Sequence, residues 1–454
     1  MLLISFISIL NFSNLQPIHL LLRTTKIYEL EDIETFENKL LNWAQQFDDV
    51  VWLDSNNYDQ QYSSYDAVLA VDAFTAIQTD YLQGFEKLKE YYTTTNDWIF
   101  GYLTYDLKND VEHLKSTNFD NLNFPDLCFF QPKRLFLFKG NQLEIKYLNC
   151  VDDELESDFQ EIWHCKDSER GNLRNESSNI KIKLRTHKDK YFEKVKNILA
   201  HIHRGDIYEA NFCQEFYAEN TLINPLEIYK KLNIISKPPF ASFVKSQNKY
   251  VLCASPERYI KKKDNHIISQ PIKGTAKRSI NKEEDNELKN NLLNDEKERS
   301  ENVMIVDLVR NDLSKTALKG SVKVEELCKI YTFDQVHQMI STVTSKVDKT
   351  THPIDIIKST FPMGSMTGAP KISAMNIIEN LEKTKRGVYS GAIGYFSPNG
   401  NFDFNVVIRS ILYNETKQYV SYSVCGAITA KSDPLKEYEE CLIKAKAMRT
   451  VLEG

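Results

Sequence analysis

The pattern of hydrophobic and polar residues predicts a mixture of strands and helices along most of the chain. Short apolar runs at residues 50–53 and 67–71 are typical of buried strands, and residues 135–138, followed by Lys-Gly-Asn, predict one arm and the turn of a hairpin. Apolar residues spaced three or four apart within 191–202 share one face of a predicted helix, and a strand-like run at 207–216 follows. Because strands and helices do not alternate strictly, the pattern favours an α+β fold over a doubly wound sheet.

The same pattern divides the chain into four segments. Residues 1–25 are apolar but interrupted by polar side chains, with no preceding basic residue and no small-residue cleavage site, so we interpret them as a disordered or mis-started extension. Residues 26–150 are predicted to form an N-terminal α/β subdomain. Residues 151–186 are polar and are interpreted as a linker or surface excursion, and residues 187–454 form the segment with the sharpest pattern.

Composition excludes some classes of protein. With 454 residues, 42% hydrophobic and 26% charged, the chain is long and apolar enough for a large core. The net charge of −6 gives no basic footprint, so no nucleic-acid partner is expected, and no membrane association is expected either. The eight cysteines are scattered without a Cys-x-x-Cys pair, which predicts reduced thiols in a cytoplasmic protein.

Two pairs of acidic residues carry metal-binding potential. Glu298 and Glu301 are three residues apart, as are Glu437 and Glu440, so on a helix each pair shares a face. An Asp-Pro sequence at 433–434 supports a helix start, because Asp is a good N-cap and Pro fits the first turn. Two such helices present the oxygen ligands that Mg²⁺ prefers. Pairs of this kind are also common on solvated helices.

Three further segments draw attention. Glu257 lies in Ser-Pro-Glu-Arg, and 14 residues later begins the sequence around Lys273, in which Gly274 permits a tight turn and Thr275 adds a hydroxyl. A lysine before such a turn is also consistent with a solvent-facing hairpin. The glycine-rich segment 361–371 precedes a predicted helix, whose free N–H groups are suited to anions.

Together these segments define a specific pattern. The motifs SPER, PIKGT, ENVMIVDLVRNDL, FPMGSMTGAPK, RGVYSGAIGYF and KEYEECLIKAKAM occur in this order. The sequence resembles the chorismate-utilising enzymes, which include anthranilate synthase component I, aminodeoxychorismate synthase component I, and the isochorismate and salicylate synthases. The resemblance covers residues 187–452 strongly and residues 26–150 loosely. It implies layered antiparallel sheets with flanking helices in one α/β sandwich, and a chorismate-binding catalytic domain at 187–454.

The resemblance also implies roles for individual residues. Mg²⁺ would be bound by Glu301 and Glu440 directly and by Glu298 and Glu437 through water. Glu257 matches the general acid that protonates the departing 4-hydroxyl of chorismate, a step that is needed because hydroxide is a poor leaving group. The residues that match substrate-binding positions are Gly274, Thr275, Tyr389, Arg409, Gly426 and Lys444.

Lys273 points to one branch of the family. Anthranilate synthases resemble PIAGT at this motif, whereas aminodeoxychorismate synthases have PIKGT. The resemblance therefore implies that Lys273 is a catalytic residue that attacks C2 of the ring, so that ammonia adds at C4 and gives 4-amino-4-deoxychorismate, for 4-aminobenzoate and folate synthesis; anthranilate synthase component I is the alternative. A lysine amine is nucleophilic only when unprotonated, so either its pKa is lowered or its proton is removed during binding. Isochorismate and salicylate synthases use a lysine base near the place of Glu209, so activation of water at C2 is disfavoured here.

The ammonia must have a source. The chain lacks the Gly-x-Cys-x-Gly motif of a glutaminase, which predicts a separate glutamine amidotransferase subunit in a heterodimer. The motif with which many anthranilate synthases sense tryptophan is only echoed at residues 52–55. We therefore expect no feedback by tryptophan.

Overall fold

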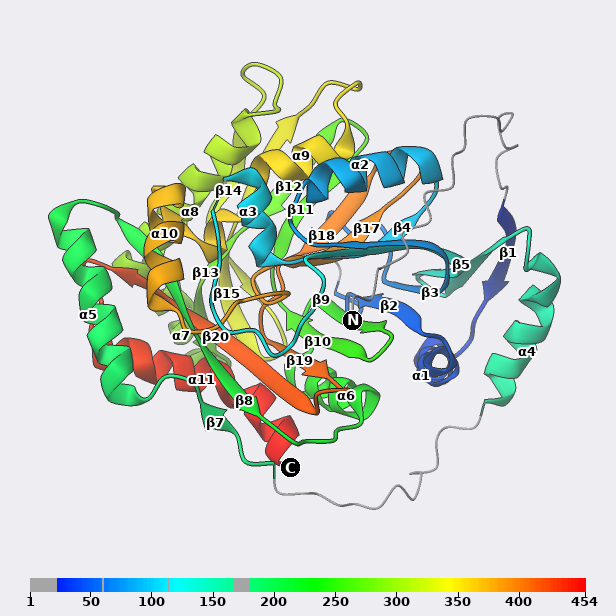
Figure 1. Cartoon of the computed structure of the whole chain (residues 1–454), viewed down its shortest axis with the longest axis horizontal. Coiled ribbons are helices and arrows are strands. Elements are labelled where there is room, and N and C mark those ends of the chain that lie inside the picture. The colour runs from blue at the N-terminus through cyan, green and yellow to red at the C-terminus, as the bar shows by residue number, and fades with distance from the viewer. Residues whose placement is uncertain (1–22, 59–60, 113, 166–179) are drawn as a thin grey trace, which may run out of the picture.

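A computed structural model describes residues 23–58, 61–112, 114–165 and 180–454. Within these residues the strands form one connected antiparallel network, with helices packed around it (Figure 1). The predicted α+β class and its layered antiparallel sheets are confirmed. The predicted extension at residues 1–25 lies outside the described residues, except for its last three residues, which belong to the first strand.

Strands make up much of the described chain. Their bounds are β1 Arg23–Glu29, β2 Asp49–Asp54, β3 Ala67–Thr79, β4 Ile99–Leu103, β5 Leu127–Lys139, β6 Gln142–Leu148, β7 Lys183–Leu184, β8 Glu209–Ala218, β9 Phe240–Ser246, β10 Lys249–Ser255, β11 Arg258–Lys263, β12 His266–Gln270, β13 Ile272–Lys277, β14 Lys323–Thr332, β15 Val336–Lys346, β16 Gly368–Ala369, β17 Ala392–Phe396, β18 Phe402–Asn405, β19 Ser410–Asn414 and β20 Tyr419–Thr429. The strands predicted at 50–53, 67–71 and 135–138 lie within β2, β3 and β5.

The helices differ in length and in what they cover. Their bounds are α1 Ile33–Trp43, α2 Gly84–Thr95, α3 Lys108–Val111, α4 Leu155–His164, α5 Lys188–Arg204, α6 Pro225–Ser236, α7 Lys282–Asn294, α8 Glu296–Ser314, α9 Pro353–Thr360, α10 Lys371–Leu381 and α11 Pro434–Glu453. In Figure 1, α5, α10 and α11 lie at one end of the molecule and α1 and α4 at the other. The helix predicted at 191–202 is α5, and Asp433 caps α11 as predicted, accepting hydrogen bonds from the backbone N–H groups of Leu435 and Lys436.

The strand network has two arms that meet at the long strand β5. One arm runs β3, β2, β9, β10, β19, β20 and β8. The other runs β4, β17, β18, β11, β12 and β15, and β15 also pairs with β13 and β14. β5 pairs with β3, β4 and β6. Because β2 pairs with β9 and β4 with β17, the segment 26–150 shares its sheet with the segment 187–454.

Two hydrophobic cores lie on opposite faces of the first arm. Along β10, Val251 and Cys253 pack in one core, whereas Tyr250 and Leu252 pack in the other, as the alternation of side chains along a strand requires. The first core also contains residues of the second arm, including Ile260 and others of β11, β12 and β18. The second core contains apolar residues of α1, α5, α6, α10 and α11. The molecule is therefore layered, with helices outside the sheet arms.

Two stretches differ from expectation. The region at 281–300 is strongly charged, a composition typical of one solvated helix, but it contains α7 and the start of α8, because Asp295 ends α7 and its side chain caps the N-terminus of α8. The segment predicted as a linker contains α4, in which Leu155, Phe159 and Ile162 form a buried stripe beside α1. Their spacing is helical, although the surrounding residues are acidic.

Candidate active site

The segment around Lys273 forms β13 and lies against α8. Gly274 has a φ of +89°, a conformation that glycine adopts without strain. A Cβ atom at this position would lie 3.1 Å from Leu292 and 3.2 Å from a carboxylate oxygen of Glu298. The glycine therefore lets β13 approach the acidic face of α8, as its conformation and spacing both require. Thr275, by contrast, is exposed.

Lys273 lies inside a group of carboxylates. Its Nζ donates a hydrogen bond to Oε1 of Glu209 at 3.2 Å, and only 13% of its side chain is exposed. Burial alone would lower the pKa of Lys273, but the negative charges of Glu209 and Glu301 outweigh burial and raise the pKa above its ordinary value. The solvent-facing hairpin lysine considered from sequence is thus not what the structure contains. The amine is an ammonium ion until a neighbouring group takes its proton.

Glu257 follows β10 and is 4% exposed. Burial raises its pKa to about 7, while the Ser365 hydroxyl and the positive charge of Lys273 limit the increase. A carboxyl group of this kind still holds a proton near neutral pH. It therefore has the property that proton donation to a leaving group requires.

The raised pKa of Glu257 has a consequence for stability. The folded state holds this proton more tightly than the unfolded state, in which the pKa is near 4.5. The carboxyl group therefore costs no stability below pH 4.5, and its cost grows as pH rises through about 7. We expect Glu257→Gln to raise the free energy of unfolding at pH 8 by up to about 3 kcal/mol, because each pKa unit corresponds to roughly 1.4 kcal/mol.

Thermal unfolding of the protein without Mg²⁺ or substrate, at pH 4.5 and pH 8, measures this effect. The exposed Glu296→Gln is the control and should leave the melting temperature unchanged at both pH values. Equal melting temperatures for Glu257→Gln and the unaltered protein at pH 8 would contradict the burial cost.

The two acidic pairs lie on helices, as predicted, and each has one strongly buried member. Glu301 on α8 and Glu437 on α11 are 7% and 2% exposed. Oε1 of Glu301 is buried without a hydrogen-bond partner, and burial raises the pKa of this carboxyl to about 7. A buried carboxylate oxygen that accepts no hydrogen bond is an incomplete arrangement that a cation would complete.

Lys297 lies between the two helices. Its Nζ is 3.7 Å from Oε1 of Glu301 and 3.6 Å from Oε1 of Glu437, so one ammonium group faces carboxylates of both helices. Among the described residues, no three acidic, histidine or cysteine side chains converge closely enough to form a complete metal site. The carboxylates nevertheless fit Mg²⁺, because they are hard oxygen ligands and already hold the ammonium group of Lys297 between the two helices.

The other predicted substrate-binding residues gather beside α11. Nζ of Lys444 donates to the backbone oxygen of Cys425 at 2.9 Å, and Nη1 of Arg409 donates to the backbone oxygen of Lys444 at 3.2 Å. Burial lowers the pKa of Arg409, which the neighbouring Tyr389 hydroxyl partly offsets. A Cβ atom on Gly426 would lie 3.2 Å from Glu437. Lys444 and Arg409 therefore place positive charge beside the acidic pairs, and Gly426 places no side chain against Glu437.

Glu440 links the two groups of residues. Burial acts to raise its pKa, but the adjacent Lys444 outweighs burial and lowers it, and Lys273 contributes in the same direction. The negative charge of Glu440 in turn acts to raise the pKa of Arg409. The predicted nucleophile, cation ligands and substrate-binding cations therefore lie within one electrostatic neighbourhood.

A buried ion pair that was not predicted from the sequence connects the glycine-rich segment to β8. Arg386 donates to Glu382 at 2.7 and 2.9 Å, to the backbone oxygen of Asn211 at 2.7 Å, and to that of Met366 at 2.7 Å. The glycine-rich segment 361–371 is thereby tied to β8. Arg386 opens the RGVYSGAIGYF motif, but a single sequence gives no sign of its contacts with Asn211 and Met366.

The cysteines require one correction. Cys213 on β8 and Cys425 on β20 form a disulfide, so the prediction that all eight thiols are reduced was wrong for this pair. The two residues face each other directly in the antiparallel register of β8 and β20. They are 212 residues apart in sequence, a separation from which no pairing can be inferred.

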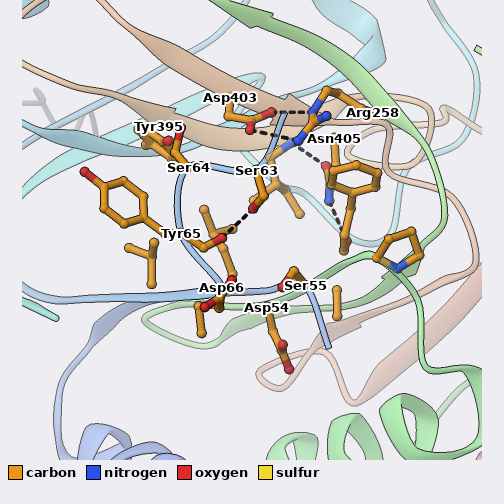
Figure 2. A pocket seen from close by; sticks show the side chains of 17 residues that line it. Asp54, Ser55, Ser63, Ser64, Tyr65, Asp66, Arg258, Tyr395, Asp403 and Asn405 are labelled. Atoms are coloured by element: carbon orange, nitrogen blue, oxygen red, sulfur yellow. Dashed lines mark hydrogen bonds and ion pairs between the residues drawn. The ribbon is translucent and has the colours of Figure 1, made fainter. Parts of the chain in front are cut away.

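A pocket away from the predicted site residues, shown in Figure 2, lies between β2, β3, β11 and β18 and is lined by none of them. Arg258 points to Asp403 there, with Nε 3.0 Å from the carboxylate, and Asn405 donates to the backbone oxygen of Phe240. Asp54 and Ser55, from the segment that echoes the tryptophan-sensing motif, also line this pocket. The absence of tryptophan feedback stays a prediction.

Comparison with known proteins identifies the class. The family model described as chorismate binding enzyme matches residues 37–450. The chain therefore belongs to the chorismate-binding enzyme family. The match extends from within the segment 26–150 to within the segment 187–454.

Named relatives fall into two groups. Aminodeoxychorismate synthase component 1 of Bacillus subtilis is 33% identical over 78% of this chain and 76% of its own length. Anthranilate synthase component 1 of Acetivibrio thermocellus is 32% identical over 79% of this chain and 75% of its own length. A probable chloroplastic aminodeoxychorismate synthase of rice is 35% identical over 78% of this chain, which spans 43% of the rice protein.

Solved structures agree on the fold. Anthranilate synthase component I from Streptococcus pneumoniae superposes with a TM-score of 0.74 at 25% identity, covering 86% of this chain and 95% of that one. The menaquinone-specific isochorismate synthase of Escherichia coli gives a TM-score of 0.71 at 14% identity, covering 95% of each chain. Among the described residues, no helix has the length and apolar character needed to cross a membrane.

Proposed function

We propose that the chain binds chorismate and replaces its 4-hydroxyl with an amino group, giving 4-amino-4-deoxychorismate for the synthesis of 4-aminobenzoate and folate. Family membership and relatives named aminodeoxychorismate synthase support this proposal. The observation that carries it is Lys273, a buried amine whose charge is surrounded by carboxylates, one of which is the proton-holding Glu257. An alanine at this position could not act as a nucleophile.

The chemistry takes place in two displacements. The Lys273 nitrogen forms a bond to C2 of the ring, both ring double bonds shift by one position, and the bond from C4 to the hydroxyl breaks. Glu257 gives its proton to the departing oxygen, which leaves as water. Ammonia then forms a bond to C4, both double bonds shift back, and the bond from C2 to the lysine nitrogen breaks, so the amine stays at C4.

The acidic pairs serve the binding of substrate. Glu301 and Glu440 would hold Mg²⁺ directly, with Glu298 and Glu437 holding it through water, and the bound ion supplies positive charge for the ring carboxylate of chorismate. Arg409 and Lys444 add two cations suited to a dianionic substrate, and arginine can bind a carboxylate with two parallel hydrogen bonds. Tyr389, Gly274, Thr275 and Gly426 are proposed to complete the substrate contacts.

The cation site can be tested separately from turnover. We expect Glu440→Gln to weaken Mn²⁺ binding at least about tenfold, since replacing a supporting group in metal sites costs roughly 10–100-fold in affinity. Titration followed by the electron paramagnetic resonance of free Mn²⁺ measures this directly. The adjacent Glu439→Gln, exposed on the same helix, should leave the affinity unchanged. Equal affinities for the two variants would contradict this assignment of ligands.

The proposed source of ammonia is a separate glutamine amidotransferase subunit, which the "component 1" names of relatives support. The purified chain should therefore use ammonium salts but not glutamine. Turnover with glutamine by the chain alone would overturn this part of the proposal.

The decisive experiment identifies the product. The purified chain is mixed with chorismate, Mg²⁺ and an ammonium salt at mildly alkaline pH, and products are followed by mass spectrometry with and without 4-amino-4-deoxychorismate lyase. A non-aromatic amino product that the lyase converts to 4-aminobenzoate is expected. Anthranilate with pyruvate would instead assign the activity named for the Acetivibrio thermocellus relative. No turnover would leave a chorismate-binding protein without catalysis.

A further inference from the structure

Glu209 is the residue in closest polar contact with Lys273. It opens β8, and its side chain is fully buried. Its Oε1 accepts the hydrogen bond from Nζ of Lys273 at 3.2 Å, the position that a proton acceptor for this amine must occupy. The two residues are 64 positions apart in sequence, at the starts of β8 and β13, so it is the packing of these strands that brings them into contact.

The second carboxylate oxygen of Glu209 is buried and has no hydrogen-bond partner. Buried carboxylates that serve only as structural counter-ions normally have both oxygens satisfied, because burial of an unsatisfied charged group is costly. Glu215, on the same face of the same strand, shows this arrangement: Arg185 donates to one of its oxygens and Tyr419 to the other. Glu209 therefore differs from Glu215 in having one buried oxygen to which no group donates a hydrogen bond.

Lys273 cannot attack carbon while it is an ammonium ion, and its carboxylate neighbours favour that ion. The charged groups that face it are Glu209 from β8, Glu257 after β10, Glu298 and Glu301 from α8, and Glu440 from α11. Glu257 is engaged as proton donor to the leaving group, and the carboxylates of α8 and α11 belong to the proposed cation site. Glu209 is the one that is hydrogen-bonded to the amine and has no other role.

We propose that Glu209 accepts the proton of Lys273 when chorismate binds and returns it when the lysine leaves. This inference rests on the proposed function. In the forward step the N–H bond of the ammonium breaks, Glu209 becomes a neutral carboxylic acid, and the freed electron pair of Nζ forms the bond to C2. When the bond from C2 to nitrogen breaks, Lys273 leaves as a neutral amine and takes its proton back from Glu209.

Burial drives this transfer in the right direction. The proton transfer converts two buried charges into two neutral groups, which lowers the cost of excluding water. Chorismate bound over Lys273 would remove the remaining solvent from its partly exposed side chain, so substrate binding itself favours the neutral pair. Before substrate arrives, the ion pair keeps the amine protonated and unreactive.

The test compares Glu209→Gln with the unaltered protein in ammonia-dependent turnover, from pH 6.5 to 10 at constant free ammonia. Glutamine keeps the volume and the acceptor oxygen but cannot take a proton. We expect kcat at pH 7.5 to fall about 100-fold relative to the unaltered protein, as loss of a general base typically does, and this deficit to shrink about tenfold per pH unit as Lys273 loses its proton to solvent instead. The KM for chorismate should stay within about threefold.

Two further variants complete the experiment. Glu209→Asp keeps a proton acceptor one methylene group farther away, and should retain the pH profile of the unaltered protein with kcat reduced about tenfold. Glu215→Gln, which removes a buried, cation-paired carboxylate elsewhere on β8, should leave the pH profile of kcat unchanged.

The inference is overturned if Glu209→Gln keeps kcat within threefold, if its kcat falls equally at every pH, or if its KM rises as much as its kcat falls, which would mark a structural role. If Glu209→Gln does not fold, Glu209→Asp decides, because an unchanged kcat in that variant would also overturn the inference. Failure of the proposed function is separate: it is read from the product that the unaltered protein makes.

Discussion

Lys273→Ala is expected to reduce C4 amination of chorismate by about 10³-fold or more, because removal of a covalent nucleophile from an assembled site leaves only binding and the remaining electrostatic groups. The loss should appear in kcat, while the KM for chorismate changes little, since substrate carboxylates are assigned to Arg409, Lys444 and the cation. Product formation is measured by mass spectrometry with the lyase-coupled conversion to 4-aminobenzoate.

Lys277→Ala is the matched control. Lys277 lies on the same strand, four residues along, and is exposed, so its removal should leave turnover unchanged. Amination that continues within tenfold of the unaltered rate in Lys273→Ala would contradict a covalent role for this lysine. A switch of product from 4-amino-4-deoxychorismate to anthranilate would instead show that Lys273 determines the position of amination without being needed for turnover.

Sequence reasoning predicted the elements that local patterns determine. The α+β class, the strands β2, β3 and β5, and the Asp433 cap of α11 follow from apolar periodicity and capping preferences that act over a few residues. The acidic pairs of α8 and α11 fall on helices for the same reason. Family resemblance, and not local pattern, was needed to connect these segments into one site.

Sequence reasoning failed where a property depends on residues far apart. The pairing of Cys213 with Cys425 depends on the register of two strands 212 residues apart. The raised pKa of Lys273 arises from Glu209 and Glu301, neither of which is near it in sequence. Glu209 itself gave a signal, since an acidic residue at the start of an apolar strand indicates a buried partner, but the partner could not be identified.

The raised pKa of Lys273 decides how this lysine can become a nucleophile. A nucleophilic lysine can be prepared either by burial that lowers its pKa or by a base that removes its proton. Sequence alone left both routes open. The carboxylates around Lys273 exclude the first in the ligand-free protein, and so the site needs a proton acceptor as well as a proton donor. Glu209 is hydrogen-bonded to this amine and the charge of Glu257 also acts on it, so the two residues are suited to these two roles.

Glu257→Gln is expected to lower kcat for C4 amination by about 10²–10⁴-fold, the range typical of lost general acid catalysis, because the glutamine amide cannot protonate the departing hydroxyl. In the unaltered protein the rate should fall as pH rises through about 7, since Glu257 acts only while it holds its proton. The variant should lack this falling limb. Rates at constant free ammonia between pH 5.5 and 9 measure both effects.

The same variant that loses activity should gain stability at pH 8, and this combination distinguishes a functional acid from a structural one. A carboxyl group kept in a buried position at a cost to folding is retained for what it does in the reaction, since an amide there would fold better. Glu215→Gln, at a buried carboxylate whose two oxygens accept hydrogen bonds from Tyr419 and Arg185, should keep its rate. A Glu257→Gln variant that loses both stability and activity would assign Glu257 to the structure of the site, and the proton for the leaving hydroxyl would have to come from another group.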